Sequence, residues 1–277
     1  MTALLLTLKK QPELPVDLSP LTPDKLKGKS KAQISAIKLI NGKDKTPVST
    51  LFSVSGSDTE NIRIQRSCRQ LTHIGEDMSF GEIQVRGDAG NYLGKHMHGG
   101  HIKVSGHSGD STACGLKGGL IEIDGDVGDR LGANFIGELH GMSDGTVIVS
   151  GNAGHRVGER MRRGTIVVRG HVGEYCANWM LAGSIIVLGK TGNYLGNGMK
   201  RGTVILTKKP RHMIATFRHC GLLKIEFLRL FFKQMALANK EFNFFRNFGP
   251  EAIRFAGDVS CEGLGEILVL KNARISK

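Results

Sequence analysis

Three histidines, His96, His98 and His101, lie close together in the chain and belong to a residue type that binds metal ions. His96 and His98 fall in an expected turn, whereas His101 begins the strand that follows. No carboxylate completes a ligand set around them. We therefore expect no metal ion to be bound by this group.

The cysteines offer no second chemical site. They are odd in number and far apart, and none belongs to the close pairs that bind zinc or perform redox reactions. No serine, cysteine and histidine cluster has the spacing of a nucleophile and its base. We expect reduced thiols and no catalytic residue in this chain. The cysteines are Cys68, Cys114, Cys176, Cys220 and Cys261.

The charge balance indicates an anionic partner. Lysine and arginine total 38 against 25 aspartates and glutamates, which gives a formal net charge of +13. This excess does not distinguish a nucleic acid, a protein surface and a small polyanion. With one tryptophan, three tyrosines and no recognised reading motif, nucleic-acid binding has little support.

The elements that position these residues are set by an internal repeat. Residues 81–94 (GEIQVRGDAGNYLG) and 119–132 (GLIEIDGDVGDRLG) share one template, which returns along the middle of the chain. Successive opening glycines are 19, 19, 26, 19, 19 and 19 residues apart, so one interval carries 26 − 19 = 7 extra residues, between 135 and 144. The opening glycines are Gly81, Gly100, Gly119, Gly145, Gly164, Gly183 and Gly202.

Apolar residues recur at fixed places in the template. The alternation after each opening glycine is typical of a half-buried strand. If each template is one coil, equivalent residues lie about 4.8 Å apart in vertical columns. One column runs from Ile83 to Val204, a second from Val85 to Leu206, and a third, mostly methionine, from Met78 to Met199. We interpret the methionine column as core packing rather than a copper site.

The glycines that follow the strands predict sharp turns. We expect them to need a positive φ or a close approach between backbones. A dinucleotide-binding loop is excluded, because that fingerprint opens a helix once, whereas here it recurs in every coil with no helix after it. These glycines are Gly87, Gly106, Gly125, Gly151, Gly170 and Gly189.

The repeat and its flanks together resemble a known family. The G-x-x-G-x-x-x-G array resembles the C subunit of formylmethanofuran dehydrogenase and the C-terminal domain of the glutamate synthase large subunit. The flanks 16–21 (VDLSPL) and 26–30 (LKGKS), the inserted stretch 137–142 (GELHGM) and the tail around 257–268 are similar to the C subunit of the formyltransferase/hydrolase complex of methylotrophs. The resemblance covers nearly the whole chain and implies an all-β, right-handed parallel β-helix.

The resemblance also implies a function. It indicates a heteromeric complex that transfers a formyl group between tetrahydromethanopterin and a methanofuran-type (methylofuran) carrier, with hydrolysis to formate. Formyltransferase and amidohydrolase-type chains perform that chemistry in the family. This chain is thus expected to be a structural subunit that holds no cofactor tightly.

Two alternatives stay open. The C subunit of a molybdenum or tungsten formylmethanofuran dehydrogenase differs mainly in its partner subunits. A β-helix acyltransferase represents another class, although its rhythm of about eighteen residues per coil does not match the template here.

The chain divides into three expected parts. Residues 1–60 should form a strand, small helices and a loop, with helix-start signals at 22–24 and 30–33. Residues 61–207 should form the coils, with an atypical first coil at Ile62 and Ile64. Residues 208–277 should add strands and an apolar helix over 221–240 that covers the open end or a neighbouring subunit. The expected apolar face consists of Leu223, Phe227, Leu230, Phe231 and Met235.

No membrane segment is expected. The leucine-rich run at residues 4–8 is too short to span a bilayer, and it lacks the charged front end of a signal peptide. We interpret it as a strand of a cytoplasmic protein.

Stacked coils would gather basic residues along one edge. Either this edge is a solvated surface that keeps the strands soluble, or it faces an anion. The carriers of the family bear glutamate-rich tails, and several carboxylates on several cations would give multivalent, salt-sensitive binding. The basic edge consists of Lys117, Arg162, Arg163, Lys200 and Arg201, with Arg160 adjacent.

Overall fold

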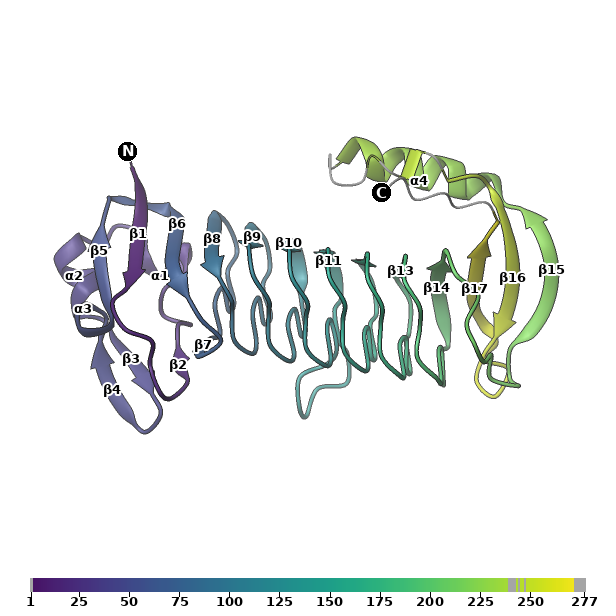
Figure 1. Ribbon diagram of the computed structural model, residues 1–277, viewed down its shortest axis with the longest axis horizontal. Helices are drawn as coiled ribbons and strands as arrows, with labels where there is room; N and C mark the ends of the chain where they lie inside the picture. Colours follow the sequence, from purple (N-terminus) through teal and green to yellow (C-terminus); the bar gives the residue numbers. More distant parts are fainter. Residues whose placement is uncertain (1, 239–242, 244, 247, 272–277) are drawn as a thin grey trace.

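The computed structural model describes residues 2–238, 243, 245–246 and 248–271. Within these residues the protein is mostly β, as expected, with one mixed sheet of 13 strands and a second sheet of four. Figure 1 shows an elongated stack, with small helices at the N-terminal end and one longer helix along the C-terminal half.

The middle of the large sheet is a run of parallel strands, one from each repeat. Ile102 pairs with Ile83 on one side and with Ile121 on the other, so equivalent residues of successive repeats lie over one another. A second set of parallel bridges links Ser108 to Val127 and continues to Thr191. The strands are β8 (Glu82–Gly87), β9 (His101–Val104), β10 (Lys117–Ile123), β11 (Asp144–Val149), β12 (Thr165–Val168), β13 (Ser184–Val187) and β14 (Arg201–Leu206).

The three predicted apolar columns form the core of the stack. Their members are fully or almost fully buried, from Ile83 and Val85 at one end to Val204 and Leu206 at the other. The methionines of the third column are fully buried among them. Each such side chain contributes roughly 1.5–3 kcal/mol by burial, so the columns are a main source of stability.

The glycines after the strands meet the expectation, and close backbone approach is the commoner of the two reasons. Of the glycines after the strands, only Gly87 has a positive φ (+115°); Gly125, for example, does not. A β-carbon at Gly125 would stand 2.6 Å from the carbonyl oxygen of Gly106 in the coil below, so close backbone approach is the reason for glycine there. It is the opening glycines, such as Gly164 (φ +93°), that adopt the left-handed conformation.

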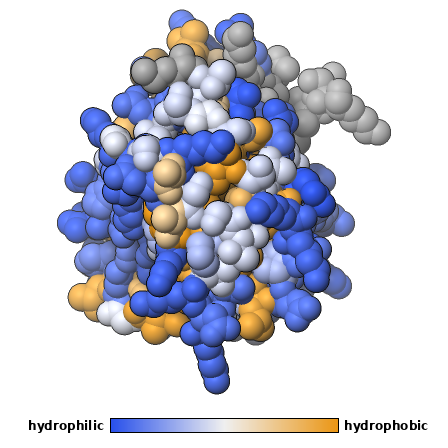
Figure 2. All heavy atoms as spheres, turned by 90° about the vertical axis from the view of Figure 1, so that its left-hand side faces the viewer, coloured by the Kyte–Doolittle hydropathy of each residue, from blue (hydrophilic) through white to orange (hydrophobic). Residues whose placement is uncertain are grey.

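The N-terminal segment extends and covers one end of the stack. Strand β6 (Asp58–Ser67) pairs Ile62 with Ile83 in parallel, which confirms the atypical first coil. Beyond it lie β1 (Ala3–Leu8) and then β5 (Phe52–Ser55) at the edge of the sheet. Figure 2 shows this end as mainly hydrophilic, with a smaller hydrophobic area near its centre.

Short elements complete this end. The helix-start signal predicted at 30–33 is confirmed at α2 as a capping box, in which the Ser30 hydroxyl accepts from the Gln33 amide and the Gln33 side chain accepts from the Ser30 amide. The helices are α1 (Pro23–Leu26), α2 (Lys31–Ala36) and α3 (Val48–Leu51). The second sheet consists of β2 (Val16–Asp17), β3 (Lys38–Asn41), β4 (Asp44–Pro47) and β7 (Leu71–Thr72).

The C-terminal segment adds three strands to the other end. Strand β17 (Leu264–Leu270) pairs in parallel with β14, and β16 (Glu251–Gly257) and β15 (Arg218–Lys224) follow in antiparallel order. The predicted helix over 221–240 is wrong at its start, because 218–224 is a strand and α4 runs over Glu226–Ala238. Residues 239 and 240 lie outside the described residues.

The predicted helix face and its location also need correction. Leu228, Phe232 and Met235 are buried, whereas Phe227 and Leu230 are exposed. Apolar residues at five of the first seven helix positions cover more than one side, so periodicity could not select the packed side. The helix does not cover the open end. It packs on the outer face of the sheet, against a column of outward-facing residues (Figure 1). This column is Ile148, Val167, Ile186, Ile205 and Leu268.

Candidate functional site

The predicted basic edge lies where a turn meets the strand that follows it, and Lys117 and Arg201 are the first residues of β10 and β14. Lys117, Arg162, Arg163, Lys200 and Arg201 are all exposed, and Arg160 is half-buried. The edge is not continuous, however. The turn between Lys117 and Arg162 carries Ser143 and Asp144, and Lys117 pairs with Asp144 across the strands. The turn between Arg163 and Lys200 carries Leu181 and Ala182.

The cations of the edge differ in their partners. Lys200 Nζ lies 3.6 Å from one carboxylate oxygen of Glu262, and Arg201 Nη2 lies 3.5 Å from the other. Glu262 comes from the loop between β16 and β17, far along the sequence. For Arg162 and Arg163 the structure shows no ion pair within the residues it describes. Lys117 likewise shows no ion pair there, because its pairing with Asp144 is between backbones. Lys117, Arg162 and Arg163 are therefore the cations of the edge most available to a ligand.

An apolar groove lies beside the edge. Its cavity of about 410 Å³ is lined by the edge members Arg160 and Lys200 together with Trp179, Leu181 and Leu139. The Arg160 guanidinium sits over the Trp179 ring, 4.5 Å from its centroid, and Trp179 is 49% exposed. A flat apolar surface flanked by cations is suited to a ring or chain that carries carboxylates.

A buried carboxylate orients the turn that bears Arg160. Glu159 is 4% exposed and accepts from Arg130 Nη1 at 2.7 Å and from Arg156 Nη1 at 2.9 Å. The Asn178 amide, one coil away, donates to the same carboxylate at 2.9 Å. This network joins neighbouring coils at Glu159 and Asn178, the residues next to Arg160 and Trp179 of the groove, and holds their turns in register.

The seven-residue insertion is pinned to the preceding coils. The Lys95 ammonium lies 4.0 Å from the centroid of the Phe135 ring, and His96 and Tyr92 contact the same ring edge to face. His96 Nε2 is 2.9 Å from a carboxylate oxygen of Glu138. The insertion therefore forms a fixed wall of the groove through Leu139 and His140.

The three neighbouring histidines do not converge on one point. His96 faces the insertion, whereas His101 Nε2 lies 2.9 Å from Glu122 on the outer face of the sheet. Among the residues that the structure describes, none of His96, His98 and His101 belongs to a group with metal-ligand geometry.

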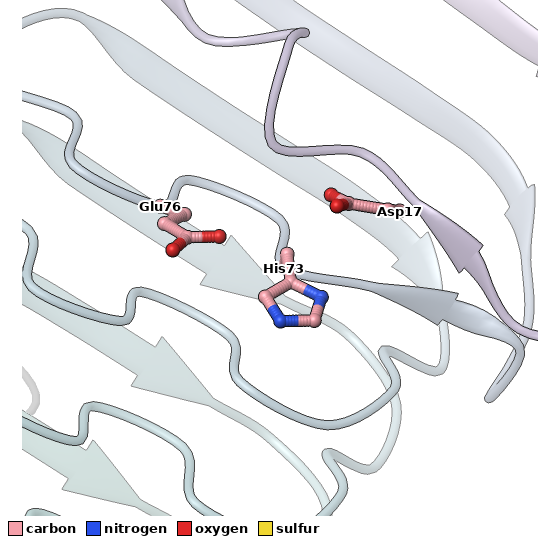
Figure 3. A group of neighbouring side chains, drawn as sticks. All are labelled: Asp17, His73 and Glu76. Atoms are coloured by element: carbon pink, nitrogen blue, oxygen red, sulfur yellow. The ribbon is translucent and has the colours of Figure 1, made fainter. Parts of the chain in front are cut away.

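One other group has ligand atoms close together. Asp17, His73 and Glu76 each offer an atom within 4.8 Å of the others (Figure 3). The Glu76 carboxylate is, however, paired with Lys95 Nζ at 2.9 Å, and His73 Nδ1 lies 3.1 Å from the Thr72 hydroxyl. Because an ammonium already neutralises one of the two carboxylates, we assign no metal ion to this group.

Two polar ladders run along the stack and were not anticipated from the sequence. In the first, a side-chain acceptor takes the backbone N–H of the equivalent residue one coil later; His171 Nδ1 accepts from the Lys190 amide at 2.8 Å. The signal was the recurrence of Asp, Asn or His after both template glycines, because these types share an acceptor one bond beyond Cγ. The first ladder is Asp88, His107, Asp126, Asn152 and His171. The second is Asn91, Asp110, Asp129 and His155.

The thiols do not form a reactive site. All five cysteines are free. Burial raises the pKa of both the Cys114 and Cys176 thiols to about 12, so both stay protonated at neutral pH. Cys220 and Cys261 are exposed, and Cys261 borders the groove.

Comparison with known proteins places this arrangement in a family. Residues 63–229 match the family model described as the GXGXG motif. The chain belongs to the GXGXG motif family. The matched region of this family member begins within β6 and continues through the coils into α4.

Named relatives of this GXGXG motif protein agree with the predicted resemblance. It is 39% identical over 95 residues to the C subunit of tungsten-containing formylmethanofuran dehydrogenase 2 from Methanococcus maripaludis. It is 32% identical over 98 residues to the C subunit of molybdenum-containing formylmethanofuran dehydrogenase 1 from Methanosarcina barkeri. These matches cover 34% of this chain in each case, and 35% and 33% of the relatives. The chain thus spans about a third of the length of these curated relatives.

A solved structure matches over the full length. A chain of the crystal structure of the formyltransferase/hydrolase complex (FhcABCD) from Methylorubrum extorquens, determined with methylofuran, superposes with a TM-score of 0.88. The match has 31% sequence identity and covers 97% of this GXGXG motif protein and 100% of that chain. The resemblance predicted from the repeat and flanks is confirmed. In the described part of the chain, no helix has the length and apolar character needed to cross a membrane.

Proposed function

We propose that this protein is a non-catalytic structural subunit of a formyltransferase/hydrolase complex. That complex transfers a formyl group between tetrahydromethanopterin and a methanofuran-type carrier and hydrolyses it to formate. The observation that carries the proposal is the full-length match, 97% of one chain and 100% of the other, to a chain of such a complex.

The arrangement of reactive groups supports a structural role. The acceptors that recur along the coils are used in the ladders, and the buried Glu159 is used by two arginines. Two of the thiols are held protonated by burial. The recurring acceptors and the Glu159 network thus fix one coil on the next.

The finer account of the fold belongs to the same proposal. We take the coils to be a right-handed parallel β-helix, divided from its flanks as residues 1–60, 61–207 and 208–277. The parallel register of β8 to β14 and the full-length structural match support this division. A rigid prism of this kind offers long faces on which other subunits can be arranged.

We further propose that the basic edge and its groove bind the anionic carrier used by the complex. Arg162 and Arg163 would contact successive carboxylates, and Arg160, Trp179 and Lys200 would hold the adjoining stretch of the ligand. The chain itself holds no cofactor tightly in this account, because the edge is open and its contacts are long-range and screened by salt.

The second candidate is the C subunit of a molybdenum- or tungsten-containing formylmethanofuran dehydrogenase. The identity to named subunits of that enzyme favours it, although over only a third of their length. The two candidates differ in their partner subunits, and this chain has the same structural role in both.

Purification from the native host tests the proposal. An affinity-tagged copy should retain formyltransferase and amidohydrolase-type subunits at fixed stoichiometry, with formyl transfer in the complex and none in the free chain. A free chain with its own turnover would contradict the structural role. Recovery of a molybdenum or tungsten subunit would support the dehydrogenase instead.

A further inference from the structure

The last strand of the large sheet has a free edge. In the described part of the chain, β15 is paired only with β16 and ends the sheet order. Figure 1 shows it as the outermost strand at the end opposite the N-terminal helices. None of its seven residues is buried, and the exposed set includes Leu222 (48%) and Leu223 (38%). Unpaired backbone groups and apolar side chains are thus presented together.

The opposite edge of the sheet is protected in a way that β15 is not. Strand β5 has four residues with alternate ones buried, and helices α2 and α3 pack against it. Short or covered edge strands are the usual means by which proteins avoid edge-to-edge association. The contrast indicates that the exposed edge at β15 is open to a partner.

The charges of β15 select against a second copy of the same strand. The strand contains Arg218, His219 and Lys224 and no carboxylate, and the Lys224 ammonium lies 2.9 Å from the carboxylate of Glu226, just beyond the strand. Antiparallel self-pairing about the central Gly221 would place Arg218 opposite Lys224, and like charges in that position are destabilising. The register shift between His219 and Leu222, with Gly221 at φ +82°, further interrupts a regular self-paired ladder. A strand of another chain with carboxylates opposite Arg218 and Lys224 would avoid this repulsion, and it would have to accommodate the same register shift.

We propose that the free edge of β15 docks an extended, carboxylate-bearing segment of another subunit, which adds to the sheet as a further strand. Backbone hydrogen bonds supply the affinity, Leu222 and Leu223 supply apolar contact, and Arg218 and Lys224 select acidic residues. This inference rests on the proposed function for the identity of the partner, and it adds the surface and the chemistry of recognition.

Thiol labelling provides a direct test, because Cys220 lies in the middle of β15 and is exposed. The full-length chain alone and the purified complex would be labelled with a charged maleimide, and each cysteine followed by mass spectrometry. We expect Cys220 to react about tenfold or more slowly in the complex, with matching protection of the 218–224 amides from hydrogen exchange. Cys261 borders the proposed carrier groove, so labelling of both exposed cysteines in the free chain, run in parallel, reports that the reagent is active.

Charge reversal identifies the acidic partner. The double substitution Arg218→Glu and Lys224→Glu should restore Cys220 labelling to the rate of the free chain and weaken retention of the partner. Lys208→Glu with Lys209→Glu, two exposed lysines near the same end, is the matched control and should change neither. An unchanged emission spectrum of Trp179, the single tryptophan, would show that the variants fold.

The outcomes separate this inference from the proposed function. Suppose that the expected subunits copurify but Cys220 reacts as fast as in the free chain. This result would refute docking at the β15 edge and would leave the proposed function intact. A dimer of the isolated chain with Cys220 protected means that a second copy occupies the edge, which also overturns it. A chain that purifies alone with Cys220 reactive contradicts both.

Discussion

The indole ring of Trp179 lies against the α-carbon of Gly198, its equivalent one coil later, so closely that a β-carbon on Gly198 would overlap with Cδ1 of the ring. Gly198 also has a φ of +68°. The position of the Trp179 ring thus requires that residue 198 has no side chain. Both residues line the groove beside the basic edge, so the shape of the groove depends on this contact.

Substituting Gly198 with alanine should therefore open the groove. We expect the indole to rotate into solvent and the free energy of unfolding to fall by about 1–2 kcal/mol through backbone strain. Because Trp179 is the single tryptophan, acrylamide quenching of its fluorescence reports the change directly. Gly249→Ala is the control, since a β-carbon there meets no atom within 4 Å and its φ is not positive. Equal quenching in both variants would refute the account.

The first polar ladder should tolerate exchange between its own residue types. His171→Leu leaves the exposed Lys190 amide without its side-chain acceptor and should lower the free energy of unfolding by about 0.5–1.5 kcal/mol. His171→Asn should cost much less, because Asn152 occupies the preceding position and accepts the His171 amide at 2.8 Å. Thermal unfolding of the two variants provides the comparison. A leucine variant as stable as the asparagine variant would show that the ladder contributes little.

The basic edge should affect carrier use without affecting assembly. Reversing the charge of Arg162, Arg163 and Lys200 should raise the KM of the complex for its carrier severalfold at low salt and less at high salt, because screening weakens the contacts. The set of subunits in the complex should not change. Lys29→Glu with Lys31→Glu, at the opposite end, is the control. Unchanged kinetics at low salt would mean that the basic edge does not bind the carrier and is only a solvated surface.

The buried thiols predict a loss of stability at alkaline pH. The folded chain keeps protons on Cys114 and Cys176 up to about pH 12, whereas the unfolded chain releases them near the ordinary pKa of 9.0. The unfolded state is therefore favoured as pH rises from 9 towards 12, and the free energy of unfolding should decrease there. Denaturant unfolding of the parent and of Cys176→Ala between pH 7 and about pH 10 should show a shallower decrease in the variant.

The sequence predicts the core well because its spacing is regular. A fixed interval between Ile83, Ile102 and Ile121 has one simple explanation, and their pairing agrees with it. Helix α4 was harder to place, because the signal for its position lies in the strands and not in the helix. The outward-facing strand residue is polar at Gln84, Lys103 and Glu122, then becomes Ile148 and stays apolar in the later strands.

The site was predictable only in part. The basic residues could be counted by position, but the coil that carries Asp144 interrupts the column. The partner Glu262 lies about sixty residues from Lys200 in the chain, so its contact depends on the packing of the C-terminal strands. Trp179 was not singled out, because a lone aromatic residue in a repeat has no partner until the coils are stacked.

The match between α4 and the apolar stretch of the sheet limits how the array can change in length. A coil duplicated among β8 to β10 would extend the polar, uncovered face and leave the helix undisturbed. A coil duplicated among β11 to β14 would add one more outward-facing apolar residue to the column. A helix of fixed length could not cover it, so it would be exposed to solvent. Growth or loss of coils in related chains should therefore be tolerated towards the N-terminal side and resisted beneath the helix.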